Sequence, residues 1–406
     1  MGIEDKNEAT FFTVIIPTRE RSDTLIHTLK TALAQEYDQF QVLVSDNASE
    51  DDTCEKVTSI KDSRLKYVNT GQRVSMSENW EYALSHVDRG WVTVLGDDDA
   101  ILPGTLRNVN EIIKKTGTSA ICSNGCSYQW PGFNGSNYGG LSISLRKGYE
   151  IRESGQMLQQ VLDGTRHYIE LPMLYNGGFV SFDLINQVKL VTERLFMSMT
   201  PDVYSAIVFS LLTDSYVYSH EPLAINGASL HSGGTAGFER DKQKRSYDPA
   251  EKFWSEKNIP FHEELPLLEN GRPVRSIQVI VYEAYLQAKK FHVYKQISTN
   301  HANQLKLVCK KSGPDHSEIV EWAKLFAQKH GLDLSQRSSS PSIFNGLRRI
   351  FNRVANVPYS YPIKGSLLNP LENVADASLV VGALKQIHPS ISARVMRHIQ
   401  NRITNV

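Results

Sequence analysis

Short apolar runs alternate regularly with amphipathic segments through the first 130 residues of the chain. The runs are rich in β-branched residues, which is typical of buried strands, and the segments between them repeat apolar residues at helical spacing. This alternation predicts crossover units that build a mostly parallel sheet with helices on both faces. The predicted strands are residues 11–18, 41–45, 65–69, 91–95 and 119–124, and the predicted helices are residues 22–33, 53–60, 75–86 and 103–113.

Polar clusters follow three of these strands. Residues 18–21 follow the first strand, Asp46 and Asn47 end the second, and residues 97–99 follow the fourth. In parallel sheets, ligands bind just beyond the carboxyl ends of the strands, so we expect the three clusters to form one site. Their chemistry suits a polar, phosphorylated ligand held together with a metal ion.

The three consecutive acids Asp97, Asp98 and Asp99 are the most informative of these clusters. Like charges at the end of a buried strand repel one another and must stay hydrated or paired. A hard divalent cation would compensate, because it prefers carboxylate oxygens. The alternative is an acidic turn that only caps the following helix.

The pattern changes after about residue 130. Residues 130–140 are rich in glycine and aromatic residues and predict a loop. Beyond the loop we predict helices at residues 156–162, 184–190, 202–213, 275–293 and 317–330, a return to the sheet at 171–181, and an antiparallel pair formed by 216–218 and 223–225.

In the C-terminal part, the composition of residues 336–341 predicts a linker. Residues 342–354 predict a basic amphipathic helix. Such a helix either lies on an anionic membrane surface or docks on the rest of the protein.

Composition narrows the classes of protein. The chain has 406 residues, of which 40% are hydrophobic, and its 44 basic and 44 acidic residues balance. This balance does not favour bulk binding of nucleic acid. The four cysteines are few and spread out, which indicates reduced thiols rather than a disulfide framework. We expect neither a signal peptide nor a transmembrane helix, because no apolar stretch is long enough.

Two common nucleotide-binding motifs are missing from the sequence. It has no Gly-x-x-x-x-Gly-Lys-Ser/Thr phosphate loop and no Gly-x-Gly-x-x-Gly after the first strand. The sequence therefore argues against a P-loop NTPase and against a dinucleotide-binding Rossmann domain.

Three ordered motifs resemble those of family 2 glycosyltransferases with the GT-A fold. They are residues 12–21 (FTVIIPTRER), 44–53 (VSDNASEDDT) and 96–104 (GDDDAILPG). The resemblance covers about the first 235 residues. It implies a GT-A domain at residues 1–235, with a nucleotide-sugar-binding half at 10–130 and an acceptor-binding half at 131–235. Residues 236–335 would then be a mainly helical extension, and residues 336–406 a linker and a C-terminal amphipathic helical region.

The resemblance also implies roles for individual residues. Asp202 would be the general base of an inverting transfer, and the alternative is a residue that only caps the following helix. Glu20 and Arg21 are either part of the first polar cluster or charges of a loop. Trp130 and Tyr138 would either stack on an acceptor sugar or only pack. His231 is either a further metal or phosphate contact or a structural histidine. The implied nucleotide-sugar contacts are Pro17, Thr18, Arg19, Asp46, Asn47, Asn79, Asp97 and Asp98, and the implied ligands of Mn²⁺ or Mg²⁺ are Asp99, Asp97 and His231.

The leading functional hypothesis is therefore transfer of a sugar from a nucleoside-diphosphate sugar, with a UDP-sugar favoured, to a glycan or lipid-linked acceptor during bacterial surface polysaccharide synthesis. We expect a cytoplasmic protein, peripheral on the inner face of the plasma membrane if residues 342–354 bind it. The alternatives are a sugar-phosphate nucleotidyltransferase and a non-catalytic scaffold that keeps the donor site. The nucleotidyltransferase would need a glycine-rich loop after the first strand, which residues 17–20 lack.

Overall fold

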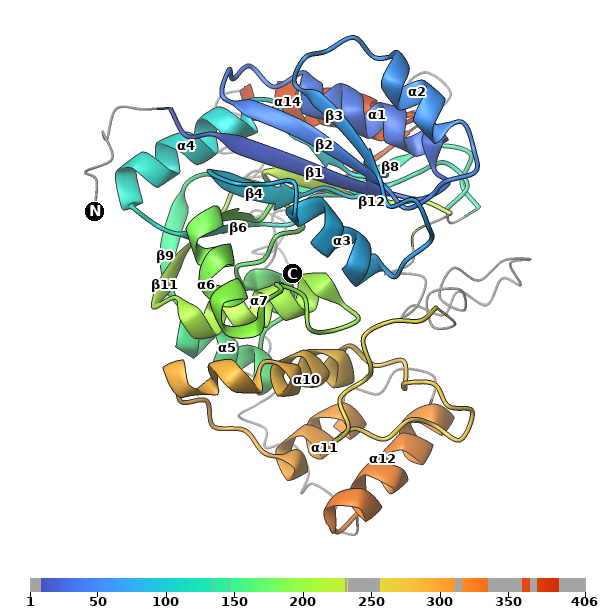
Figure 1. Cartoon of the computed structure of the whole chain (residues 1–406), viewed down its shortest axis with the longest axis vertical. Coiled ribbons are helices and arrows are strands. Elements are labelled where there is room, and N and C mark those ends of the chain that lie inside the picture. The colour runs from blue at the N-terminus through green and yellow to red at the C-terminus, as the bar shows by residue number, and fades with distance from the viewer. Residues whose placement is uncertain are drawn as a thin grey trace, which may run out of the picture.

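The computed structural model describes residues 9–133, 135–144, 146–230, 232, 256–310, 316–334, 360–365 and 371–386. The strands of its main sheet are β1 (Phe12–Thr18), β2 (Phe40–Asp46), β3 (Leu65–Asn69), β4 (Trp91–Val94), β6 (Ala120–Ser123), β9 (Tyr149–Glu153), β10 (Phe179–Ser181) and β11 (Ser215–Ser219). Within the described residues this sheet has eight strands in the order β3-β2-β1-β4-β10-β6-β11-β9 (Figure 1).

Most neighbours in this sheet are parallel. β1 pairs in parallel with β2 and β4, β2 with β3, and β6 with β11, whereas β10 and β9 run antiparallel to their neighbours. Side chains of β1 alternate between two hydrophobic cores, because successive residues of a strand point to opposite faces. The predicted α/β class with a mostly parallel sheet is confirmed.

Helices cover both faces of the sheet. One core contains side chains of α1 (Ser22–Leu33), α2 (Thr53–Ser59) and α4 (Thr105–Thr116). The other core contains side chains of α3 (Met76–Leu84), α5 (Ser154–Leu162), α6 (Phe182–Thr192) and α7 (Pro201–Leu212). The apolar positions recognised in the sequence, such as Trp80 and Leu106, are buried at these contacts. Helix α4 begins at Thr105, two residues later than predicted, because Gly104 takes a left-handed conformation with φ of 72°.

A smaller sheet lies beside the carboxyl end of β4. Its strands are β5 (Ala100–Ile101), β7 (Ser127–Gln129), β8 (Gly140–Ser144), β12 (Ala224–Ala228) and β13 (Ser360–Lys364), in the order β13-β8-β7-β12-β5. The sequence analysis did not recognise β5, β7 or β8, which are short and lie next to glycine-rich loops.

The predicted antiparallel pair at 216–218 and 223–225 is wrong. β11 joins the main sheet beside β6 and β9, whereas β12 joins the smaller sheet between β7 and β5. Gly227 explains why β12 belongs there. A Cβ at this position would lie only 1.8 Å from the backbone oxygen of Asp98, so glycine allows β12 to approach the three acids.

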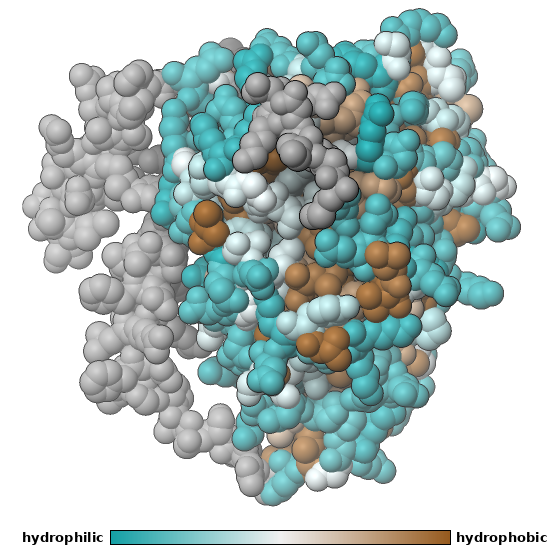
Figure 2. Space-filling model, turned by 60° about the vertical axis from the view of Figure 1, so that its left-hand side comes forward, coloured by the Kyte–Doolittle hydropathy of each residue, from teal (hydrophilic) through white to brown (hydrophobic). Residues whose placement is uncertain are grey.

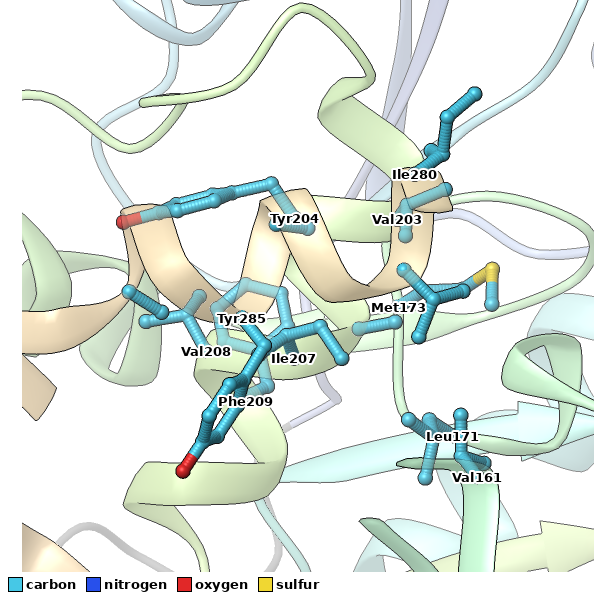
Figure 3. Close-up of a cluster of buried hydrophobic side chains, with 14 of the residues drawn as sticks. Val161, Leu171, Met173, Val203, Tyr204, Ile207, Val208, Phe209, Ile280 and Tyr285 are labelled. Carbon is cyan, nitrogen blue, oxygen red and sulfur yellow. The ribbon is translucent and has the colours of Figure 1, made fainter. Parts of the chain in front are cut away.

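The described part of the helical extension packs on the sheet domain. It contains α10 (Ile277–Gln287), the 3-10 segment η2 (Lys289–Tyr294), α11 (His301–Lys310) and α12 (His316–His330). α10 lies against α7, and Ile280 and Tyr285 of α10 pack beside Val203 and Ile207 of α7 (Figure 3). One continuous hydrophobic core therefore runs from the sheet into the extension. α11 was not predicted, because only Leu305 and Val308 mark its buried apolar side.

The C-terminal part returns to the N-terminal half. β13 pairs with β8, and α14 (Val374–Gln386) packs beside α1 and against the smaller sheet (Figure 1). The predicted domain boundaries stay predictions. The predicted linker at 336–341, the amphipathic helix at 342–354 and His231 all lie outside the described residues.

The surface is mainly hydrophilic on the face that Figure 2 shows, with a few apolar side chains gathered near its middle. Large apolar side chains exposed in the described residues include Ile151, Leu190 and Val293. Scattered apolar residues of this kind are ordinary on protein surfaces. No helix in the described part of the chain has the length and apolar character needed to cross a bilayer.

Candidate functional site

The carboxyl ends of β1, β2 and β4 meet at one edge of the main sheet, as the sequence predicted. Thr18 ends β1 and donates from Oγ1 to Asp97 Oδ2 at 2.8 Å. The backbone N–H of Asn47 donates to the carbonyl of Thr18 at 2.9 Å. These two bonds join the polar clusters that follow β1, β2 and β4 into a single group.

Arg21 also belongs to this group. Its Nη1 donates to Asp97 Oδ1 at 2.8 Å, and only a quarter of the Arg21 side chain is exposed. Burial alone would lower the pKa of Arg21, but the charges of Asp97 and Asp98 raise it overall. The sequence analysis left open whether Arg21 is only a loop charge, and the structure makes it the cationic partner of the first acid.

Asp46 is fully buried beside the end of β3. Its carboxylate accepts hydrogen bonds from Tyr67 Oη at 2.6 Å, Asn69 Nδ2 at 3.1 Å and the backbone N–H of Ser49 at 3.0 Å. Burial, and then the bond to Asp46, raises the pKa of Tyr67. A carboxylate accepts about four hydrogen bonds, so Asp46 keeps the capacity for one more.

Two predicted contact residues bond to nearby backbone. The side chain of Asn47 donates to the carbonyl of Val74 and accepts from its N–H, both at 2.8 Å. The side chain of Asn79 accepts from Ser45 Oγ at 2.7 Å. These bonds tie α3 and the segment before it to the end of β2, and Pro17 lies beside Ser45 in the same register.

Arg19 points to the helical extension. Its Nη1 forms an ion pair of 2.5 Å with Oε1 of Glu256, and both side chains are mostly buried. The structure therefore connects a predicted nucleotide contact with a residue far along the chain.

The three consecutive acids turn their carboxylates to different partners. Asp98 Oδ2 accepts from Ser229 Oγ and Ser232 Oγ, both at 2.6 Å. Asp99 accepts from the N–H of Gly227 at 2.6 Å and from that of Gly96 at 2.9 Å. All three acids are at most 5% exposed. They are therefore part of a hydrogen-bonded core between the two sheets and do not form an exposed acidic turn.

The electrostatics of these acids suit a bound cation. Burial raises the pKa of Asp99 to about 8, and the neighbouring Asp98 adds to this effect. Burial also raises the pKa of Asp97, although Arg21 and Thr18 offset part of the increase. Crowded, buried carboxylates lack positive charge, and a divalent ion would supply it.

The geometry limits how such an ion could be held. Among the described residues, no three or more His, Cys, Asp or Glu side chains lie close enough together to bind a metal ion by themselves. Mg²⁺ in nucleotide sites usually needs only one or two carboxylates, together with phosphate oxygens and water. The acids of this site fit that mode of binding.

Tyr175 is a central residue that the sequence analysis missed. Its hydroxyl bonds to Asp99 and accepts from Asn226 Nδ2 at 3.3 Å. Trp130 was considered as a stacking or packing residue, and in the structure its Nε1 donates to the backbone oxygen of Asp98 at 2.9 Å. A single tyrosine between a helix and a strand carries no periodic signal, so pattern analysis could not single it out.

Asp202 lies in the first turn of α7, directly after Pro201. Its Oδ2 accepts from Tyr168 Oη at 3.3 Å, and the side chain is half-buried. Burial raises the pKa of Asp202, whereas bonds from the Val203 N–H and from Tyr168 lower it. The charges of Asp99, Asp98 and Asp202 all act on Tyr175, so Tyr175 lies near both Asp202 and the three acids.

Comparison with known proteins shows what the N-terminal part is similar to. Residues 13–168 match the model of glycosyl transferase family 2. Over 96 residues the chain is 33% identical to GalNAc(5)-diNAcBac-PP-undecaprenol beta-1,3-glucosyltransferase of Campylobacter jejuni, covering 23% of this chain and 31% of that protein. Over 112 residues it is 26% identical to the succinoglycan biosynthesis protein ExoO of Rhizobium meliloti, covering 28% and 32%.

Solved structures were matched as well. TarS of S. aureus in complex with UDP-GlcNAc matches with a TM-score of 0.44 and 14% identity, over 81% of this chain and 76% of that one. Mannosyltransferase PcManGT from Pyrobaculum calidifontis, in complex with GDP-Man and Mn²⁺, matches with a TM-score of 0.40 and 13% identity, over 94% and 88%.

The chain matches about a third of the length of its curated relatives. The family match begins in β1 and includes both the first polar cluster and the three acids. Residues 13–168 of this chain are therefore similar to glycosyl transferase family 2.

Proposed function

We propose that this protein is an inverting glycosyltransferase that moves one sugar from a nucleoside-diphosphate sugar to a glycan or lipid-linked acceptor. The observation that carries the proposal is the family match over residues 13–168, which contain the joined cluster of Thr18, Arg21 and Asp97. We further propose that the acceptor is a lipid-linked saccharide used for a bacterial surface polysaccharide, because the name of one curated relative contains a saccharide linked to PP-undecaprenol and the other is named for succinoglycan biosynthesis.

In this proposal the nucleotide lies along the ends of β1 and β2. Pro17, Thr18 and Arg19 line its pocket, and Asp46 accepts a hydrogen bond from the base, preferably uracil. Arg19 would exchange its ion pair with Glu256 for the phosphates, and the existing pair supports this proposal because it already holds a carboxylate beside the guanidinium group. Asn47 and Asn79 hold the end of β2 in place for this contact.

The three acids would hold the ribose and the cation. Asp97 and Asp98 face the ribose, and Asp99, with Asp97 and His231 as further candidates, binds Mn²⁺ or Mg²⁺. The bound cation neutralises charge that develops on the diphosphate leaving group. Tyr175 and Gly227 fix the direction of the Asp99 carboxylate.

Asp202 would act as the general base. It accepts the proton of the acceptor hydroxyl as that oxygen attacks the anomeric carbon from the face opposite the diphosphate, so the anomeric configuration inverts. Burial raises the pKa of Asp202 above that of an ordinary aspartate, which makes it a better proton acceptor. Helix α7 keeps the carboxylate at a fixed position on the acceptor side.

A thermal-shift screen tests the donor site. The protein is heated with UDP-, GDP-, dTDP- and CMP-sugars, each with Mn²⁺ or with EDTA. A ligand that binds only the folded state raises the melting temperature. We expect a metal-dependent increase with UDP-sugars, followed by transfer of radiolabelled sugar to a polyprenyl-diphosphate saccharide. Metal-dependent donor binding without transfer to any acceptor would favour the non-catalytic scaffold, and no binding of any donor would reject the proposal.

A further inference from the structure

Glu283 is a buried carboxyl group that the proposed reaction does not use. It lies in α10 of the helical extension, and its side chain is 1% exposed. Burying an acid without function is unfavourable, because a buried polar group must find hydrogen-bond partners. The hydrogen-bond partners of Glu283 therefore indicate which segment of the chain this side chain stabilises.

The partners of Glu283 include the segment just before Asp202. Ser198 Oγ donates to Glu283 Oε2 at 2.6 Å, and Gln287 Nε2 donates to Glu283 Oε1 at 2.8 Å. Ser198 Oγ in turn lies 3.3 Å from Thr200 Oγ1 and accepts from the Thr200 N–H at 3.4 Å. Thr200 is the N-cap residue of α7, and Asp202 follows two positions later.

Helix α3 holds the same segment from another side. Ser77 Oγ donates to the carbonyl of Ser198 at 2.8 Å, and Glu81 Oε2 accepts from the N–H groups of Leu195 and Phe196 at 2.9 and 3.0 Å. Residues 195–200 are therefore fixed between a helix of the donor half and a helix of the extension. Thr200 makes no side-chain cap bond to α7, so the start of this helix depends on the preceding segment.

We propose that Glu283 is a positioning residue for Asp202, acting through Ser198 and Thr200. It fixes the first turn of α7 so that the Asp202 carboxylate meets the acceptor hydroxyl at the reacting distance. In this proposal the helical extension helps to position a residue of the transferase site. This inference rests on the proposed role of Asp202 as general base.

Loss of this support should slow transfer without weakening donor binding. A catalytic group misplaced by about 1 Å costs about 100-fold in rate. We expect Glu283→Ala and Ser198→Ala to lower kcat by about 10-fold to 100-fold, while KM for the donor changes less than twofold. Glu283→Gln keeps an acceptor for Ser198 and should restore most of kcat.

Leu305→Ala is the matched control, because Leu305 is buried in α11 of the same extension and takes no part in the hydrogen bonds described above for residues 195–200. It should lower the melting temperature while kcat stays within twofold of wild type. If Leu305→Ala lowers kcat as much as Glu283→Ala does, or if Glu283→Gln fails to restore activity, general destabilisation explains the loss and the positioning role is wrong.

Hydrogen exchange gives a readout that does not depend on transfer. The backbone amides of residues 199–204 should exchange about tenfold faster in Glu283→Ala, as expected when a local hydrogen-bonded segment opens more readily. Their exchange rates should stay unchanged in Leu305→Ala. Unchanged exchange in Glu283→Ala would overturn the inference even if the enzyme is an active transferase. Wild-type protein that never transfers sugar would instead overturn the proposed function.

Discussion

Arg21 and Asp97 form an ion pair of 2.8 Å at the point where β1 and β4 end. Asp97 is almost completely buried, and its other oxygen accepts from Thr18. The pair places a guanidinium group among three carboxylates that otherwise repel one another. Arg21 thus keeps the acids together in the protein without ligand, which the sequence alone did not suggest.

Replacing Arg21 by Met should destabilise the fold. Removal of one partner from a buried pair costs about 3–5 kcal/mol, because the remaining charge is buried without compensation. Arg21 is a quarter exposed, so we expect a loss of about 3 kcal/mol, at the lower end of this range. Urea unfolding measures this loss as a decrease in the free energy of unfolding. The double variant Arg21→Met with Asp97→Asn should recover most of the loss, and equal stability of the single and double variants would show that the pair is not coupled.

The N-terminal half of the site was largely predictable from sequence, and the reason is local. Strands β1, β2 and β4 each end in a polar cluster of their own, so a parallel sheet brings Thr18, Asp46 and Asp97 to one edge without any long-range information. The pattern of apolar residues also placed α1 and α3 correctly.

The partners of the acids could not be predicted in the same way. Ser229 and Ser232 bond to Asp98 across more than a hundred residues of sequence, and Tyr175 reaches Asp99 from the segment before β10. Isolated polar residues carry no periodicity, and only the tertiary fold decides where they point. The same limit applies to Glu283, which looks like one more polar position within α10.

Asp99→Ala should abolish metal-dependent donor binding. The carboxylate supplies the proposed contact to the cation. Its loss also removes the acceptor for the N–H groups of Gly96 and Gly227, so folding of the variant has to be checked. Isothermal titration with UDP-sugar and Mn²⁺ measures the effect, and circular dichroism confirms folding. Asp163→Ala, at the end of α5, is the control and should bind like wild type. Unchanged nucleotide affinity with Mn²⁺ in Asp99→Ala would reject the metal assignment.

Asp202→Asn should keep donor affinity and lose transfer. General-base catalysis contributes about 10²-fold to 10⁴-fold, and an amide cannot accept the proton. Donor titration and single-turnover transfer separate the two effects. Transfer near the wild-type rate would place the base elsewhere.

The pH profile of transfer should report the surroundings of Asp202. Since burial raises its pKa, the acidic limb of kcat/KM for the acceptor should lie at higher pH than for an exposed aspartate. Tyr168 donates to the carboxylate and favours its charged form. Tyr168→Phe should therefore move the limb to still higher pH. A shift to lower pH, or none, would mean that Asp202 is not the group that titrates.

Glu283 should make stability depend on pH in a direction opposite to that of a salt-bridged acid. Burial raises its pKa from 4.5 to about 7 in the folded protein. Between these values the unfolded chain loses the proton while the folded chain keeps it, so the free energy of unfolding falls as pH rises. The contribution present below pH 4.5 is lost by about pH 7 and amounts to about 3 kcal/mol.

Glu283→Gln tests this directly, because glutamine has no proton to lose. Urea unfolding of both proteins at about pH 5 and about pH 8 gives the difference in free energy of unfolding, in which all other titrations cancel. The difference should move by about 2–3 kcal/mol in favour of Glu283→Gln as pH rises. Glu111→Gln, at an exposed position on α4, should run parallel to wild type. Parallel curves for Glu283→Gln would mean that the folded protein holds Glu283 ionised throughout, stabilised by Ser198 and Gln287 alone.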